Sequence, residues 1–153
     1  MQVTPRVPSG RTIQSCVLEG NVEAGIGIYS SDVTVQSTLI RGTTANAQDQ
    51  FGDGILVLPD IDGGPSQVTL MGNRIEASAR AGLSNFGSTI TFVSNALVCS
   101  AFDIEGEEHM GAAFSFDNQG GNVCGCPEAN GKCKVLSAGL APPKPLDPPP
   151  PPP

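Results

Sequence analysis

The stretch DIEGEEH, residues 103–109, gathers the side chains most able to do chemistry. Its candidate catalytic residues are Asp103, Glu105, Glu107, Glu108 and the only histidine, His109. Two carboxyl groups can act as general acid and general base on a sugar, with a histidine as proton carrier. The alternative is a charged loop that keeps an exposed edge of the protein in solution. We favour the loop, because no lysine or arginine occurs between Arg80 and Lys132 to complete a site.

Four aspartates form a second acidic group and are the candidates for ligand binding. They are Asp49, Asp53, Asp60 and Asp62. The stretch PDIDGGPS, residues 59–66, places two carboxylates ahead of a Gly-Gly turn, and Ca²⁺ seeks about six to eight oxygen ligands. It lacks the third acid and the closing glutamate of an EF-hand loop. A solvated turn is therefore favoured over a calcium site at Asp60 and Asp62.

Repeated segments predict the elements that position these acids. A threonine followed by an apolar residue recurs, with spacings of 22, 35 and 22 residues, at Thr12, Thr34, Thr69 and Thr91. A glycine followed by an apolar residue marks a second strand in each unit, at Gly25, Gly54, Gly82 and Gly111. The unit is 22 residues long, with insertions around residues 44–53, 59–66 and 99–110. Both acidic groups fall in these insertions.

The alternation of polar and apolar residues predicts how the repeats pack. Side chains of a strand change face at every residue, so the four threonines should form one outward column. The inward column should consist of Ile13, Val35, Leu70 and Phe92. Strands this short bury no face alone, but a coil can bury its neighbours. The predicted fold class is all-β, a right-handed parallel β-helix of about four to five coils.

The strand and turn patterns resemble the right-handed parallel β-helix repeat family of the pectin-lyase-like superfamily. The resemblance covers residues 9–118 and rests on the Val-Thr-Val strand and the turns Gly-Asn-Arg-Ile (72–75) and Ser-Asn-Ala-Leu (94–97). It implies an asparagine ladder containing Asn73 and Asn95, with Thr38 and Cys16 in the equivalent places of the first two coils. It also implies a secreted bacterial repeat protein. It implies no single activity, because this fold carries lyases, hydrolases, epimerases, adhesins and inert stalks.

Composition shifts divide the chain into four parts. Residues 1–8 are a lead-in, 9–118 the coils, 119–140 a cysteine-rich cap, and 141–153 a proline-rich tail expected to be extended or disordered. A first coil that begins at Ser9 leaves a strand edge uncovered. We expect earlier coils or another chain to pair with that edge.

The five cysteines predict a disulfide staple at the C-terminal end. The structural candidates are Cys124, Cys126 and Cys133. A one-residue spacer between the first two suits a zinc site poorly. We predict a Cys126–Cys133 bond, which leaves Cys124 for Cys99 or Cys16.

Charge and hydropathy restrict the partners. Eight basic and fifteen acidic residues give a net charge of −7, which disfavours nucleic acid. No apolar stretch has the length of a membrane span, and this chain contains no signal peptide. The leading prediction is an extracellular or cell-surface, non-catalytic solenoid that presents a structural or binding surface, toward carbohydrate and without a cofactor. The alternative is a polysaccharide-active enzyme, a lyase, hydrolase or epimerase, or part of one, with its site on the acidic loops.

Overall fold

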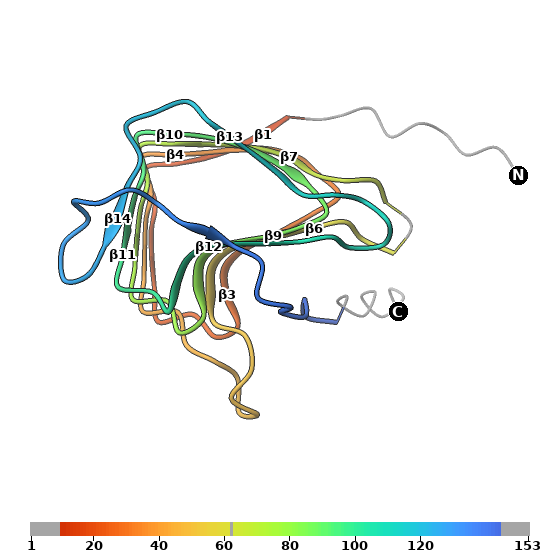
Figure 1. The fold of residues 1–153 in the computed structure, drawn as a ribbon, viewed down its shortest axis with the longest axis horizontal. Helices are drawn as coiled ribbons and strands as arrows, with labels where there is room; N and C mark the ends of the chain where they lie inside the picture. The colour runs from red at the N-terminus through yellow and green to blue at the C-terminus, as the bar shows by residue number, and fades with distance from the viewer. Residues whose placement is uncertain (1–9, 62, 145–153) are drawn as a thin grey trace, which may run out of the picture.

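Parallel strands stacked in coils make up the protein. The computed structural model describes residues 10–61 and 63–144, and in these residues the chain forms fifteen strands and no helix. The strands fall into three parallel sheets of five strands each, which enclose one core when viewed along the stack (Figure 1). This confirms the predicted all-β parallel β-helix. The lead-in 1–8, Asp62 and tail residues 145–153 lie outside the described residues.

Each coil contributes one strand to each sheet. The first sheet contains β1 (Arg11–Gln14), β4 (Asp32–Gln36), β7 (Gln67–Met71), β10 (Thr89–Val93) and β13 (Ser115–Asn118). The second sheet contains β2 (Val17–Glu19), β5 (Leu39–Arg41), β8 (Arg74–Glu76), β11 (Ala96–Val98) and β14 (Val123–Gly125). The third sheet contains β3 (Ala24–Tyr29), β6 (Asp53–Leu58), β9 (Ala81–Phe86), β12 (Phe102–Glu107) and β15 (Val135–Leu136).

The register of the first sheet follows the predicted columns. Thr12, Thr34, Thr69 and Thr91 are aligned in neighbouring strands, and Asp117 continues the column. Beneath them Val35, Leu70 and Phe92 are almost fully buried and join one core with aliphatic residues of the other two sheets. Burial of these side chains is the main term that stabilises such thin coils.

An asparagine ladder at the corner between the first and second sheets ties the coils together. The backbone N–H of Asn73 donates to Oδ1 of Asn95 at 3.0 Å, and that of Asn95 donates to Oδ1 of Asn122 at 2.9 Å. Thr38 and Cys16 extend the ladder in the first two coils, since the N–H of Thr38 donates to Asn73 and that of Cys16 to the Thr38 hydroxyl. At this corner the backbone N–H group of each coil thus finds its hydrogen-bond acceptor in a side chain of the next coil.

One predicted landmark and one predicted insertion are wrong. The register pairs the Gly82 position with Asp103, not with Gly111, and residues 102–107 form strand β12 rather than a loop. Glycine is required at Gly54 because a Cβ there would clash with the Ile75 side chain of the next coil. At the fourth coil the corresponding residue of the next coil is Cys124, which is smaller. The smaller neighbour explains how a side chain is tolerated at Asp103.

The disulfides also correct the predicted pairing. The bonds are Cys99–Cys126 and Cys124–Cys133, and Cys16 is the free cysteine of the described chain. Cys124 lies on β14 in the inward column next to Leu97, and Cys133 packs against the same core. Because Cys124 points into the core, the cysteine available to bond Cys99 of the preceding coil is Cys126, which follows the end of β14. Residues 119–140, predicted as a cap, contribute β14 and β15 to the fifth coil.

Candidate functional site

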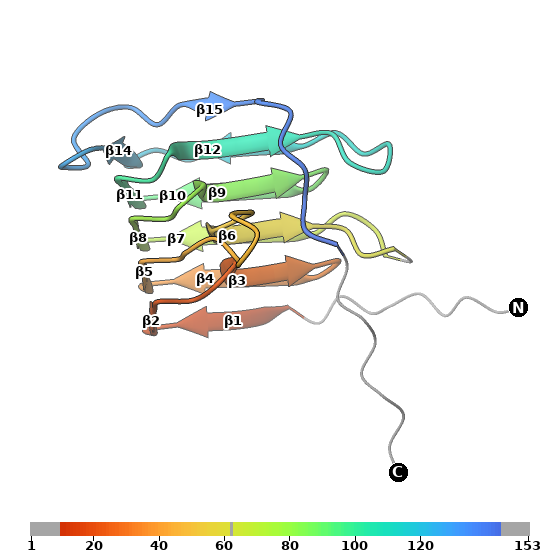
Figure 2. The ribbon, with the colours of Figure 1, turned by 90° about the horizontal axis from the view of Figure 1, so that it is seen from below.

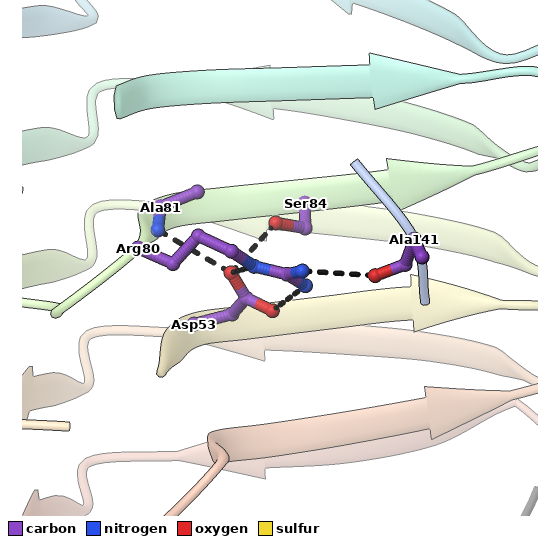
Figure 3. Close-up of polar contacts among 5 residues, drawn as sticks. All are labelled: Asp53, Arg80, Ala81, Ser84 and Ala141. Atoms are coloured by element: carbon purple, nitrogen blue, oxygen red, sulfur yellow. Dashed lines mark hydrogen bonds and ion pairs between the residues drawn. The ribbon is translucent and has the colours of Figure 1, made fainter. Parts of the chain in front are cut away.

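A buried ion pair lies on the outer face of the third sheet (Figure 3). Asp53 begins β6 and is fully buried, and Arg80 directly precedes β9. The guanidinium donates to both carboxylate oxygens, with Nε–Oδ1 at 2.9 Å and NH2–Oδ2 at 2.5 Å. The Ser84 hydroxyl and the Ala81 N–H also donate to Oδ1, at 2.9 and 3.3 Å. The carboxylate is therefore fully hydrogen-bonded, as a buried charge must be.

The guanidinium of Arg80 is fixed by more than the carboxylate. It lies over the rings of Phe51 and Phe86, at 5.2 and 5.9 Å from their centroids. Its third nitrogen, NH1, donates to the carbonyl oxygen of Ala141 at 2.9 Å (Figure 3). Stacking on aromatic faces and a paired carboxylate hold the group in one orientation.

Glu105, on the neighbouring strand β12, is the least satisfied group in this region. It aligns with Ser84 of β9 and is fully buried. Neither carboxyl oxygen has a hydrogen-bond partner among the described residues. Burial raises the pKa of Glu105 to about 8, and the nearby Glu107 carboxylate adds to the shift, while Arg80 opposes it. The carboxyl group is therefore mainly protonated at neutral pH.

Glu107 lies two residues further along β12 and behaves in the opposite way. Its carboxylate accepts hydrogen bonds from the Ser137 hydroxyl at 2.8 Å and from the N–H groups of Gly139 and Leu140. Burial by itself would raise its pKa, but these hydrogen bonds outweigh it and lower the pKa of Glu107. The glutamate stays ionised and anchors the segment that follows β15.

That segment, residues 137–144, is named the C-terminal strap here. Figure 2 shows it running from β15 past β12, β9 and β6 toward the first coils. Leu140 packs against Leu56, Leu58 and Phe86, the outward apolar side chains of β6 and β9. Every residue of β6 and of β9 is buried, because the main core covers their inward side chains and the strap crosses their outward face. The strap thus covers the ion pair and Glu105 from solvent.

The predicted binding aspartates do not gather into one site. Asp49 is exposed in a turn, where its N–H donates to the Asn46 carbonyl, whereas Asp53 is buried under the strap. Asp60 uses Oδ1 to accept the N–H of Ile61 at 2.8 Å, which is the behaviour of a solvated turn. Within residues 10–61 and 63–144, no group of three or more possible ligands could hold a metal ion.

The predicted catalytic residues are divided between two environments. Glu105 and Glu107 lie under the strap, whereas Glu108 is exposed beyond the end of β12. His109 packs its ring against the edge of Phe86, with centroids 6.2 Å apart, and its backbone pairs with Ala112. Asp103 is partly buried near the start of β12.

Sequence reasoning missed Arg80, Ser84 and the strap. The pairing of Arg80 with Asp53 could not be predicted from the 22-residue unit, because an insertion places the two residues 27 positions apart. The signal that could have found the strap is Leu140, a large apolar residue just before the proline-rich stretch.

The outer face of the first sheet is the second candidate region. Its outward side chains are mainly polar. The column of threonines lies between a column with Asp32 and Gln67 and a column in which Gln14 and Gln36 are followed by Met71 and Val93. A shallow groove of ≈ 240 Å³ runs across three coils and is lined by Asp32, Thr34, Gln67, Thr69 and Thr91, among others. No residue of the strap lines it.

Comparison with known proteins adds no relative. No family model matches the chain, and neither a curated protein nor a solved structure matches it. The described residues contain no helix with the length and apolar character that a membrane crossing requires.

Proposed function

We propose that this protein is an extracellular, non-catalytic β-helix whose first sheet presents a binding surface toward carbohydrate. The observation that carries the proposal is the in-register polar face of Thr34, Thr69 and Thr91 with the groove that crosses it. Equivalent side chains in neighbouring coils are about 4.8 Å apart, so hydroxyl and amide groups recur at regular intervals. A polymer with regularly repeated hydroxyl groups matches such a surface.

The engagement of the acids in internal contacts supports a non-catalytic role. Asp53 is neutralised by Arg80, and Glu107 holds the strap, so neither carboxylate is free to reach a substrate. The two disulfides fit an oxidising compartment, which supports the extracellular location. The asparagine ladder and the strand pattern support membership of the pectin-lyase-like superfamily, which is part of this proposal.

The test is binding of the intact protein to a panel of neutral and acidic polysaccharides, measured by affinity electrophoresis. Thr69→Lys places a long side chain in the groove and should abolish binding to the polymer that the wild type retains. Val17→Lys is the matched control, because Val17 is 62% exposed on the second sheet, away from the groove. Equal retention of wild type and Thr69→Lys on every polymer would show that the groove is not the binding surface.

A polysaccharide-active enzyme is the second candidate, and one observation favours it. Glu105 and Glu107 project from the same face of β12 with pKa values shifted in opposite directions, as in acid–base pairs of enzymes. Incubation with the same polymers, with calcium or a chelator, would reveal new reducing ends or unsaturated uronate absorbance. Activity that is lost in Glu105→Gln would replace the binding proposal with this one.

A further inference from the structure

The outer face of the third sheet holds an extended segment of chain through contacts that any copy of that segment could make. We propose that this face is a peptide-binding groove, and that the strap of a second copy of the chain, residues 137–144, is the partner that it accepts. The proposal is independent of the carbohydrate surface, which lies on the first sheet.

The groove recognises the main chain of its occupant with two charged side chains. Glu107 accepts the N–H groups of Gly139 and Leu140, and Arg80 donates to the carbonyl of Ala141. Among the described backbone hydrogen bonds, none ties residues 137–144 to the strands beneath. The strap can therefore leave without breaking a strand ladder.

One apolar side chain anchors the occupant. Leu140 sits on Leu56, Leu58 and Phe86, a cluster separate from the main core of the coils. Release of the strap would expose this cluster while leaving the main core intact. An apolar patch of this kind favours a replacement occupant.

The recognition groups are fixed before any strap arrives. Asp53 holds Arg80 through two hydrogen bonds, and the guanidinium lies over the rings of Phe51 and Phe86; none of these contacts involves the strap. A preorganised site loses little conformational entropy when it binds. At the far end, Pro143 and Lys144 line a groove of ≈ 260 Å³ together with Glu23, whose charge is opposite to that of the lysine.

The connection to the strap allows exchange between copies. Only the two-residue strand β15 joins the strap to the fifth coil, and Val135 and Leu136 are 45% and 43% exposed. Exchange of an identical segment reproduces every contact in a second molecule, which is a low-cost route to a dimer. The strap of the same molecule competes with the strap of a second copy. Its effective concentration is on the order of millimolar, as for any segment held by a short flexible linker. Exchange is thus favoured at high protein concentration.

The experiment supplies the segment in trans to a full-length chain whose own strap cannot seat. A fluorescent peptide of residues 135–144, VLSAGLAPPK, is titrated into the Leu140→Asp protein and followed by anisotropy. We expect saturable binding that is at least about tenfold tighter than to the wild type, whose own strap competes. A peptide that itself carries Leu140→Asp, and a scrambled peptide, should not bind.

A second measurement tests the second copy as partner. Sedimentation of wild type refolded at increasing concentration should reveal a dimer that Leu140→Asp does not form. Absence of peptide binding to a Leu140→Asp protein that unfolds cooperatively would overturn the groove. Equal binding of the scrambled peptide, or a wild type that stays monomeric at every concentration, would overturn the second copy as its partner. Should Leu140→Asp fail to fold, Leu140→Ala takes its place under the same criteria.

Discussion

Replacement of Glu105 by glutamine tests the electrostatics of the face beneath the strap. Glu105→Gln keeps the shape of the side chain and removes its ability to ionise. The folded protein holds the pKa of Glu105 at about 8, against 4.5 for an ordinary glutamate. The unfolded chain therefore loses this proton at a lower pH than the folded chain does. The contribution of the group to stability is fully present below pH 4.5 and is lost as the pH rises toward 8.

The magnitude follows from the size of the shift. Each pKa unit corresponds to about 1.4 kcal/mol, so the wild type should lose about 1.4 kcal/mol of unfolding free energy per pH unit from this group. The 3.5-unit interval between 4.5 and 8 amounts to about 5 kcal/mol as an upper value. Glu105→Gln should lack this slope and become more stable than the wild type as the medium becomes basic.

The assay is urea unfolding followed by circular dichroism, at closely spaced pH values from acid to mildly basic conditions. The difference in unfolding free energy between variant and wild type is then plotted against pH. Glu108→Gln is the matched control, because Glu108 is an exposed glutamate just beyond the same strand. The unfolding free energy of Glu108→Gln should change with pH as that of the wild type does. A difference between Glu105→Gln and wild type that does not change with pH would refute the assignment of a buried, protonated carboxyl group.

Two further substitutions test the packing of the third sheet by the same unfolding assay. Arg80→Met leaves Asp53 as a buried charge without its partner and should cost about 3–5 kcal/mol. Arg74→Met, at a half-exposed ion pair, should cost at most about 1 kcal/mol, and equal losses would contradict the role of burial. Gly54→Ala forces a Cβ to within 2.6 Å of a backbone carbonyl in the next coil and should cost at least about 1–3 kcal/mol. Gly64→Ala meets nothing within 4 Å and should be nearly neutral, so a similar loss in both would exclude steric crowding as the cause.

The sequence predicts the coils well because their rules are local and periodic. Alternation of threonine with apolar residues placed Thr12, Thr34, Thr69 and Thr91 in one column, and the register confirms it. The ladder position of Asn73 and Asn95 was also predicted correctly, since a tight turn repeats at a fixed place in each unit.

The fourth coil and its disulfide to the fifth were harder to predict, because contacts between coils determine them and the spacing of residues in the sequence does not. A glycine landmark misplaced Asp103, since the smaller Cys124 in the neighbouring coil removes the need for glycine there. The acids of β12 were predicted to lie in a loop because polar and apolar residues do not alternate there. Such alternation marks a strand with one solvated face, whereas both faces of β12 are covered. The bond between Cys99 and Cys126 depends on which way each side chain points at the end of β14, and cysteine spacing does not determine that direction.

The path of the strap has a consequence for how the protein unfolds. In an open stack each coil touches only its neighbours, so the end coils can fray while the middle persists. Here residues that follow the fifth coil bond to Arg80 of the third coil and reach Glu23 and Tyr29 beside the first. The strap therefore links the fifth coil to the first, so that unfolding of either end coil removes contacts from the other. The coils should therefore separate in one step, and cutting the strap should turn a single unfolding transition into a graded one.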